Sequence, residues 1–263
     1  HRIFLIGMFN KLFFSLFFLS SFILCQSELE KGVVQYNLRH SDCVENKAKS
    51  EPIAKAISYF ENALNDDKDK DEASLYLLKS YYFKSKFVLE DKKLKKEFLK
   101  KGKNLGQEYV EKFPESVEYR YWYLVNLGSW AEEYGILAAA REGVADQMRF
   151  HSKKIIELDP NYENGAGYFL LGAVHYKSPY VPFILSWPSN KDAIMWLQRA
   201  YDTGEAEIAQ VVYLAQALNK DKKKEAAVDL LKMVIERTPS VDNYASDWEW
   251  LKKARRILES FDN

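Results

Sequence analysis

The sequence predicts an all-α fold, an α-solenoid of about ten helices in antiparallel pairs with long inserts between some of the helices. From residue 51 onward, apolar residues recur three and four positions apart, which is the spacing of one face of an α-helix. The 263 residues include only 11 Gly and 7 Pro, too few for the many tight turns of a sandwich or barrel. The same apolar pattern returns along the chain, as it does in stacked helical repeats.

The composition is that of a globular protein with an aromatic-rich core. Hydrophobic residues make up 47% of the chain and aromatic residues 15%, enough for a sizeable core. Lys plus Arg and Asp plus Glu each number 38, so the net charge provides no overall attraction to a polyanion. Nucleic acid is therefore not an expected partner.

Residues 1–27 have the features of upstream residues followed by a secretory signal peptide. Met8 is the expected start, and Lys11 precedes an apolar run from Leu12 to Leu24. That run is short for a membrane span and suits the apolar region of an export signal. We expect cleavage after Ser27 and a periplasmic or otherwise exported mature chain.

The same segment leaves two alternatives to soluble export. Lipidation at Cys25 would anchor a lipoprotein, but Leu24 is bulky where such a signal has a small residue. Retention of the segment as a membrane anchor is the other. After cleavage Cys43 would be alone, so we expect no internal disulfide, which fits the bacterial periplasm or outer surface better than disulfide-rich secretion.

Residues 28–50 are mixed and polar and are expected to form a linker with an initial helix, ahead of a helical repeat domain over 51–263. At the start of that domain the spacing matches a second and then a first helix of a tetratricopeptide repeat, at Ala56, Phe60, Ala63, Leu75, Leu78 and Tyr82. Further helices are expected over residues 94–113, 116–140 and 144–158.

The tetratricopeptide spacing is clearest in two later units, which begin near residues 165 and 205. Their motif positions are Tyr168, Leu171, Gly172, His175, Ala193, Leu197 and Ala200, and Val211, Leu214, Ala215, Leu218, Ala227, Leu231, Val234 and Pro239. In the first unit 18 positions separate His175 from Ala193, where the motif has about nine, so an insert lies in its turn. A last helix over residues 242–261 would cap the array, with Trp248, Trp250 and Leu251 inward and Lys252, Lys253, Arg255 and Arg256 outward.

The order of the irregular features resembles that of a known family. The segments concerned are residues 98–102, Trp122-Tyr123, Arg141-Glu142-Gly143, residues 150–160, residues 168–172 and the loop to Pro188. They are similar to the helical array shared by the regulator of microtubule dynamics proteins and the T-component of TRAP (tripartite ATP-independent periplasmic) transporters, over residues 52–260. With an export signal, the T-component is the better match. The resemblance implies an accessory protein, in the transporter case a partner of a periplasmic solute-binding protein.

The insert Lys177–Ser189 is the main candidate for a binding surface. Three prolines stiffen it, and Tyr180, Phe183 and Trp187 make it more apolar than a solvated turn requires. These side chains would either fold back as a lid on the core or form a wall of a cleft for a ligand or partner.

Other candidates lie on the predicted helices. Trp122, Trp130 and Tyr134 share one helix face, which core packing usually explains and partner recognition explains less often. Arg141 could bind a carboxylate, although such a residue more often ties two helices together. For His151 and His175 a semi-buried structural role is the simpler interpretation, because two histidines without clustered acids or cysteines do not predict a metal site.

Residues 91–103 form a lysine-rich run with seven lysines against two acids. Apolar residues recur within it at helical spacing, so the lysines are most simply the solvated face of an amphipathic helix. A membrane-surface role is the alternative.

No nucleotide loop, metalloprotease motif or nucleophile elbow is found in the sequence, so neither an enzyme nor a cofactor is predicted. The first hypothesis is an exported, non-enzymatic protein-interaction module. Its most concrete form is a T-component-like accessory protein that contacts a periplasmic solute-binding protein and holds a small organic ligand. The alternative is a scaffold or assembly protein of the cell envelope with no ligand.

Overall fold

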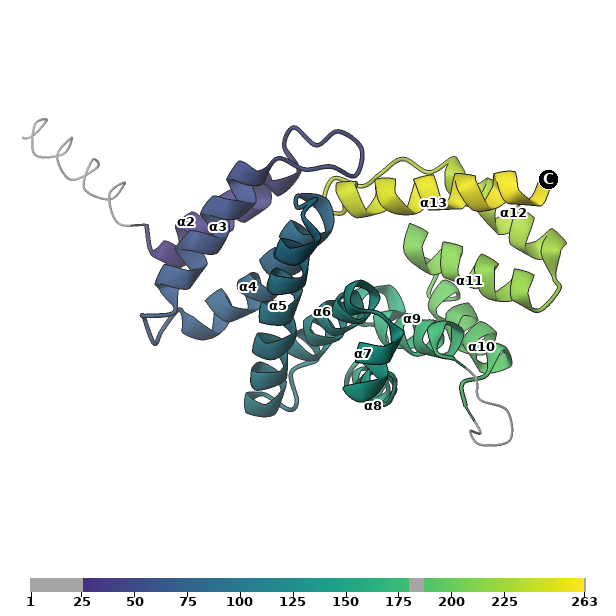
Figure 1. Cartoon of the computed structure of the whole chain (residues 1–263), viewed down its shortest axis with the longest axis horizontal. Helices are drawn as coiled ribbons and strands as arrows, with labels where there is room; N and C mark the ends of the chain where they lie inside the picture. Colours follow the sequence, from purple (N-terminus) through teal and green to yellow (C-terminus); the bar gives the residue numbers. More distant parts are fainter. Residues whose placement is uncertain (1–25, 180–186, 263) are drawn as a thin grey trace, which may run out of the picture.

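The fold is an array of α-helices stacked in antiparallel pairs (Figure 1). The computed structural model describes residues 26–179 and 187–262. In those two ranges there are twelve α-helices, one short 3₁₀ helix (η1) and no β-strand, and the elements are α2 (Glu28–Asn37), η1 (Leu38–His40), α3 (Ser50–Ala63), α4 (Lys70–Phe87), α5 (Lys92–Lys112), α6 (Val117–Tyr134), α7 (Ile136–Arg141), α8 (Val144–Leu158), α9 (Tyr162–Lys177), α10 (Asn190–Tyr201), α11 (Ile208–Lys220), α12 (Lys224–Ile235) and α13 (Tyr244–Asp262). The predicted all-α solenoid is confirmed.

Local signals account for where the helices begin and end. Ser27 Oγ accepts a hydrogen bond from the Glu30 amide (3.2 Å), and the Ser27 amide donates to the Glu30 carboxylate (2.9 Å), which forms a capping box at the start of α2. Asp91 caps α5 in the simpler way, by accepting from the Leu94 amide at 2.8 Å. The segment 28–50 therefore contains a capped helix, and α2 packs on α3.

Five helix pairs follow one another along the array: α2 with α3, α4 with α5, α6 with α8, α9 with α10, and α11 with α12. The short α7 lies in the turn of the third pair, and the insert 178–189 lies in the turn of the fourth. Both are departures from the compact repeat. The pair α9–α10 is held close by Gly172, where an added Cβ would lie 2.6 Å from Leu197 Cγ and 3.0 Å from the Leu197 amide nitrogen.

The buried apolar residues form three cores along the array. The first lies among α2, α3 and α4, the second among α4, α5, α6, α8 and α9, and the third around α11 and α12. No pair buries its apolar face alone, so each core is completed by the next pair.

Helix α13 does not simply extend the stack but crosses from the last pair back to the first helices, as Figure 1 shows. Its Ala245 is fully buried in the first core, whereas its Leu251 and Ala254 are buried in the third. Just before α13, the carbonyl of Asp242 accepts from Arg39 Nη2 at 2.7 Å and lies 2.9 Å from His40 Nε2. The array therefore closes on itself.

One expectation for α13 was wrong. Lys253 was predicted to point outward with its basic neighbours, but its ammonium lies over the rings of Trp250 (4.3 Å) and Tyr213 (5.5 Å). Burial, reinforced by nearby Lys177, lowers the pKa of Lys253 to about 8. A helix that only capped the array would have kept this face in solvent, whereas the closing helix turns it inward.

Replacing Gly172 by Leu should destabilise the protein by about 2–3 kcal/mol, because the new side chain has no space between α9 and α10. The matched control is Gly128→Ala on α6, where an added Cβ meets only the flexible Met148 Cε at 3.7 Å and helix propensity improves. Urea unfolding followed by circular dichroism measures both. Equal stability of Gly172→Leu and the wild type would contradict the described packing of this pair.

Candidate functional site

The closed array surrounds a cavity of about 800 Å³, which we call the central cleft. Its wall is built by α4, α6, α8, α9, α11 and α13, with further residues from η1, α7 and the two ends of the insert. The helices α4, α6, α9 and α11 are the first helices of their pairs, and in a solenoid these line the inner surface. The cleft is therefore a product of the stacking itself.

Side chains three and four positions apart on each first helix face the cleft. On α4 these are Lys79, Tyr82 and Lys86; on α6, Val125, Ser129 and Glu132; on α9, Leu170, Val174 and Lys177; and on α11, Ala209 and Tyr213. This is the spacing of one helix face. Since the first helices run in the same direction, the charged residues that end three of these rows come together.

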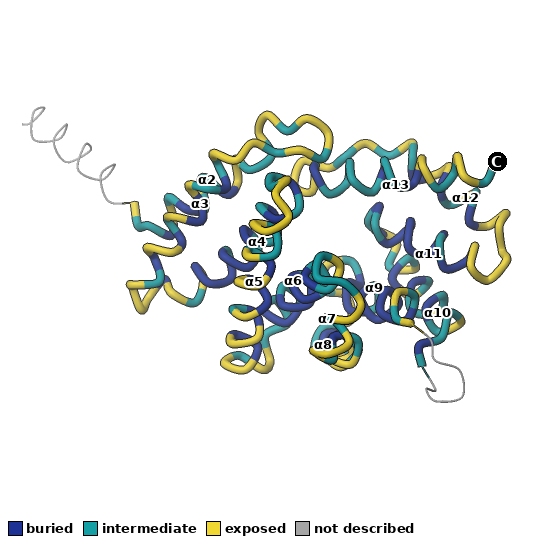
Figure 2. Tube along the Cα trace, viewed as in Figure 1, coloured by how far each residue is buried: buried dark blue, intermediate teal, exposed yellow. Residues whose placement is uncertain are grey.

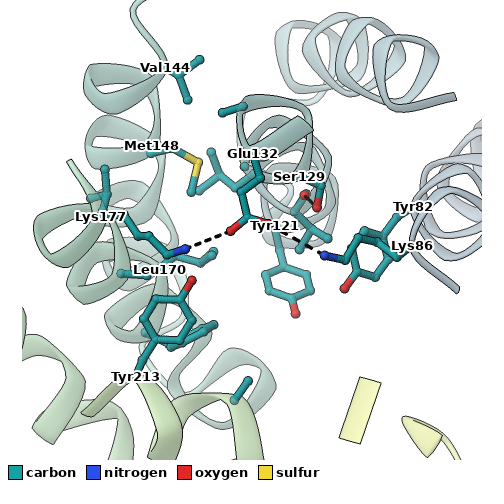
Figure 3. A pocket seen from close by; sticks show the side chains of 18 of the residues that line it. Tyr82, Lys86, Tyr121, Ser129, Glu132, Val144, Met148, Leu170, Lys177 and Tyr213 are labelled. Atoms are coloured by element: carbon teal, nitrogen blue, oxygen red, sulfur yellow. Dashed lines mark hydrogen bonds and ion pairs between the residues drawn. The ribbon is translucent and has the colours of Figure 1, made fainter. Parts of the chain in front are cut away.

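An ion network connects those ends, as Figure 3 shows. Glu132 lies between two lysines, at 3.2 Å from Lys177 Nζ and 3.8 Å from Lys86 Nζ. Lys86 also lies 3.5 Å from Glu249 of α13. The network spans α4, α6, α9 and α13, so it ties the closing helix to the inner wall while leaving charged groups at the cleft surface.

Aromatic side chains form the rest of the wall. Tyr82 and Trp122 have ring centroids 6.0 Å apart, and Tyr213 and Trp250 are 5.2 Å apart. Burial, together with nearby carboxylates, raises the pKa of the hydroxyls of Tyr82, Tyr121 and Tyr213. These hydroxyls therefore stay protonated at physiological pH and can donate hydrogen bonds to a bound group.

Glu207, at the start of α11, is the carboxyl in this cleft whose proton affinity is most altered. Burial raises its pKa to about 7, and repulsion from Glu163 and Asp247 adds to the effect. Glu163 reaches the cleft from a left-handed backbone position (φ 43°) at the start of α9. The acidic side of the cleft is therefore sensitive to pH near neutrality.

The structure brings two of the predicted site residues, Trp122 and Trp187, to the central cleft. Trp187 also packs on the second core, with the Arg149 guanidinium 4.8 Å from its ring and His175 at 5.7 Å. Trp187 therefore contacts both the second core and the central cleft. Tyr180 and Phe183 lie outside the described residues.

Trp130 and Tyr134 do not share a surface with Trp122. Their rings stack on each other at 4.5 Å on the side of α6 that faces α5, where Lys103 Nζ lies 4.5 Å from the Trp130 ring and the Tyr134 hydroxyl donates to the Lys96 carbonyl. Core packing explains both residues, whereas Trp122 is turned toward the cleft.

The remaining predicted residues lie outside the cleft wall. Arg141 is exposed at the end of α7, and no hydrogen bond or ion pair joins it to another described residue. Its neighbour Glu142 makes the helix-tying contact instead, with Lys103 at 2.8 Å. Arg141 is thus not placed by the fold to recognise a carboxylate inside the cleft.

Both histidines have structural partners. His151 Nδ1 lies 2.5 Å from Arg120 Nη1, and burial plus this cation lowers the pKa of His151 to about 4. His175 Nδ1 accepts from the Ser189 amide at 3.3 Å, which connects the end of the insert to α9, and burial lowers its pKa as well. Among the described residues no group of three or more His, Cys, Asp and Glu side chains is arranged to hold a metal ion.

Sequence reasoning missed Tyr82 as a cleft residue, and with it Lys86, Glu132 and Tyr213, whereas it included Lys177 only as the first residue of the insert. The sequence did contain a signal for these cleft residues. Lys79, Tyr82 and Lys86 lie at helical spacing on the first helix of one pair, and Lys177 is the last residue of the first helix of another. Which face of that helix turns toward the cleft depends on how the pairs are stacked. That information is not local to any helix.

A family model described as "Regulator of microtubule dynamics protein 1-3" matches residues 38–262. The crystal structure of a thermophilic TPR (tetratricopeptide repeat) protein of Thermus thermophilus is similar, with a TM-score of 0.59 and 16% identity over 88% of this chain and 97% of that chain. At this identity the similarity concerns the fold alone. No curated protein matches the sequence.

No helix in the described ranges has both the length and the apolar character needed to span a bilayer.

Replacing Glu207 by Gln should remove one component of the pH dependence of stability. The folded state keeps this proton up to about pH 7, whereas an ordinary glutamate loses it near 4.5, so the contribution of Glu207 to the unfolding free energy falls as pH rises through that interval, while the histidines with lowered pKa act in the opposite direction in both proteins. Between pH 5 and pH 8 we expect the unfolding free energy of the wild type to fall by on the order of 1–2 kcal/mol relative to that of Glu207→Gln. Urea unfolding at a series of pH values measures it, with the exposed neighbour Glu205→Gln as the control. Parallel pH profiles for wild type and Glu207→Gln would contradict the burial of this carboxyl.

Proposed function

The chain belongs to the regulator of microtubule dynamics protein 1-3 family, and we propose that it acts as a non-enzymatic protein-interaction module whose central cleft receives its partner or ligand. The observation that carries this proposal is the closure of the array around a cavity of about 800 Å³. Cavities of roughly 300–1,000 Å³ with mainly apolar walls and a few convergent polar groups are typical binding sites.

The chemistry of the wall suits binding. Glu132 is neutralised by Lys86 and Lys177, so it is held as part of an ion network and not poised as a base. Both candidate histidines are engaged outside the cleft wall. The aromatic rings and protonated tyrosine hydroxyls offer an apolar contact area with fixed donors, which suits recognition of an organic group or a partner side chain.

In its more specific form, the proposal is an exported accessory protein of the TRAP T-component type. It would contact a periplasmic solute-binding protein and hold a small organic ligand in the central cleft. The support is the apolar run Leu12–Leu24 after Lys11, together with a cleft whose size suits a small molecule. Trp122 and Trp187 would contact the ligand.

The competing role is a scaffold of the cell envelope that uses its outer helix faces and leaves the cleft without an occupant. The two roles differ in where a change would disturb binding. A side chain that fills the cleft should abolish the first role and leave the second intact.

Ser129→Trp is the change that separates the two roles. Ser129 lies on the inner face of α6, and a tryptophan there would occupy the cleft without replacing a core residue (Figure 3). We expect capture of a solute-binding protein from periplasmic extract to fall at least tenfold, or about 1.4 kcal/mol. Native mass spectrometry should show loss of any co-purifying organic molecule.

The matched control is Ser58→Trp, which adds the same side chain at an exposed position of α3 away from the cleft. Thermal unfolding of both variants checks that the fold is kept. Envelope proteins captured equally by wild type and both variants would favour the scaffold, and no captured partner or ligand in any of them would count against the cleft as a binding site.

A further inference from the structure

Helix α5 carries a concentration of positive charge that the central cleft does not use. Six lysines lie in its first ten residues, and Lys84 of α4 lies beside them; we call this set the lysine face, and it comprises Lys84, Lys92, Lys93, Lys95, Lys96, Lys100 and Lys101. The whole chain has a formal net charge of +0, so this is a local asymmetry. None of the seven lines the cleft.

The charge is also placed against the electrostatics of the helix. The N-cap Asp91 is acidic, but the first turn of α5 contains no acidic residue. Lysines therefore occupy the positive end of the helix dipole. A helix selected only for stability would have acids there. The acids of α5 are instead concentrated toward its other end, with Glu108 and Glu111 exposed near the C-terminus.

The buried side of α5 is formed by other residues, and among the α5 lysines of the lysine face only Lys96 contacts a neighbouring helix within the described ranges, with its Nζ 4.8 Å from the Tyr134 ring of α6. The side of α5 that meets the array is formed by Leu99, Gly102, Gly106 and Tyr109, which are buried. Lys103 is buried too, in an ion pair with Glu142, and is not part of the lysine face. By contrast, Lys92, Lys93 and Lys100 are exposed and join no hydrogen bond or ion pair among the described residues.

Apolar groups lie among the charges. Leu94 is 43% exposed and is flanked on both sides by lysines. Phe98 lies beneath two ammonium groups, with Lys84 Nζ 4.4 Å and Lys101 Nζ 5.2 Å from its ring centroid. The lysine side chains surround a phenylalanine, and an exposed leucine lies between them. This combination of lysines and apolar residues is typical of helices that lie on a membrane surface.

From these contacts we propose that the lysine face of α5 binds the surface of an anionic lipid bilayer. All the cations between residues 84 and 103 are lysines, which act as hydrated point charges, and none is an arginine, whose planar fork is suited to carboxylates of a protein partner. The face is the outer side of a second helix, where the exposed positions of α5 can be followed in Figure 2. The exposed Leu94 gives the contact an apolar component that an acidic protein segment would not need.

Vesicle flotation of the full chain tests this assignment. We expect binding to vesicles of phosphatidylcholine with about 30% phosphatidylserine, little binding to phosphatidylcholine alone, and release by raised salt. Neutral vesicles also measure the contribution of the apolar run 12–24. Removal of four charges, by Lys92→Gln, Lys93→Gln, Lys100→Gln and Lys101→Gln together, should weaken binding by more than about 100-fold, since each lysine near such a surface contributes about fivefold. Leu94→Ser alone should cost a few-fold.

The control removes four charges at exposed positions in and beside the turn between α11 and α12, by Lys220→Gln, Lys222→Gln, Lys223→Gln and Lys224→Gln. Equal losses in both variants would overturn the proposal, because binding would then follow net charge rather than the lysine face. Binding that does not distinguish charged from neutral vesicles would also overturn it. So would tight binding of a polyglutamate peptide without binding to vesicles, which would identify an acidic protein as the occupant.

Discussion

The structure depends on one constraint: a pair of amphipathic helices cannot bury its apolar face by itself, so every pair must be covered by another. In an open solenoid the two ends stay uncovered and require caps. Here α13 serves both ends at once, because Ala245 is buried in the first core while Leu251 and Ala254 are buried in the third. The contact of Arg39 and His40 with the Asp242 carbonyl fixes the point at which the ends meet. The closing of the array by α13 therefore buries the apolar faces at both of its ends.

The central cleft is a consequence of that closure. Once the first helices face a common interior, side chains that would be solvated on an open inner surface are surrounded by protein. The pKa of Glu207 is raised to about 7 and that of Lys253 is lowered to about 8 for this reason. The network of Lys86, Glu132 and Lys177 satisfies three other charges that enclosure would otherwise leave costly. Binding chemistry and structural support therefore involve the same residues.

The two proposed binding surfaces, the central cleft and the lysine face, lie on different helices of the pairs. First helices line the central cleft, where aromatic rings and paired charges favour a specific, enclosed occupant. The second helix α5 carries exposed lysines on its outer side, and Lys92, Lys93 and Lys100 among them join no ion pair in the described residues, so attraction to an extended anionic surface is the fitting chemistry. A partner in the cleft and a bilayer on α5 would contact different faces of the protein. Neither would have to displace the other.

Much of this architecture could be predicted from the sequence. The three- and four-residue spacing indicated the helices, Gly172 occupied a small-residue position of the repeat motif, and the long interval between His175 and Ala193 marked the insert. The central cleft could not be predicted in the same way. Periodicity identifies the residues on one face of a helix, but a core face and a cleft face are both apolar and aromatic.

Trp122 and Trp130 show the difference: they lie on the same helix, yet Trp130 packs toward α5 and Trp122 turns toward the cleft. Lys253 is a second example, because its basic neighbours in the sequence predict exposure to solvent whereas the structure places it against Trp250 and Tyr213. The sequence alone determined which segments are helical and which faces are amphipathic. Only the tertiary structure decided which faces look inward, because that depends on the rotation accumulated between successive pairs and on where α13 closes the array.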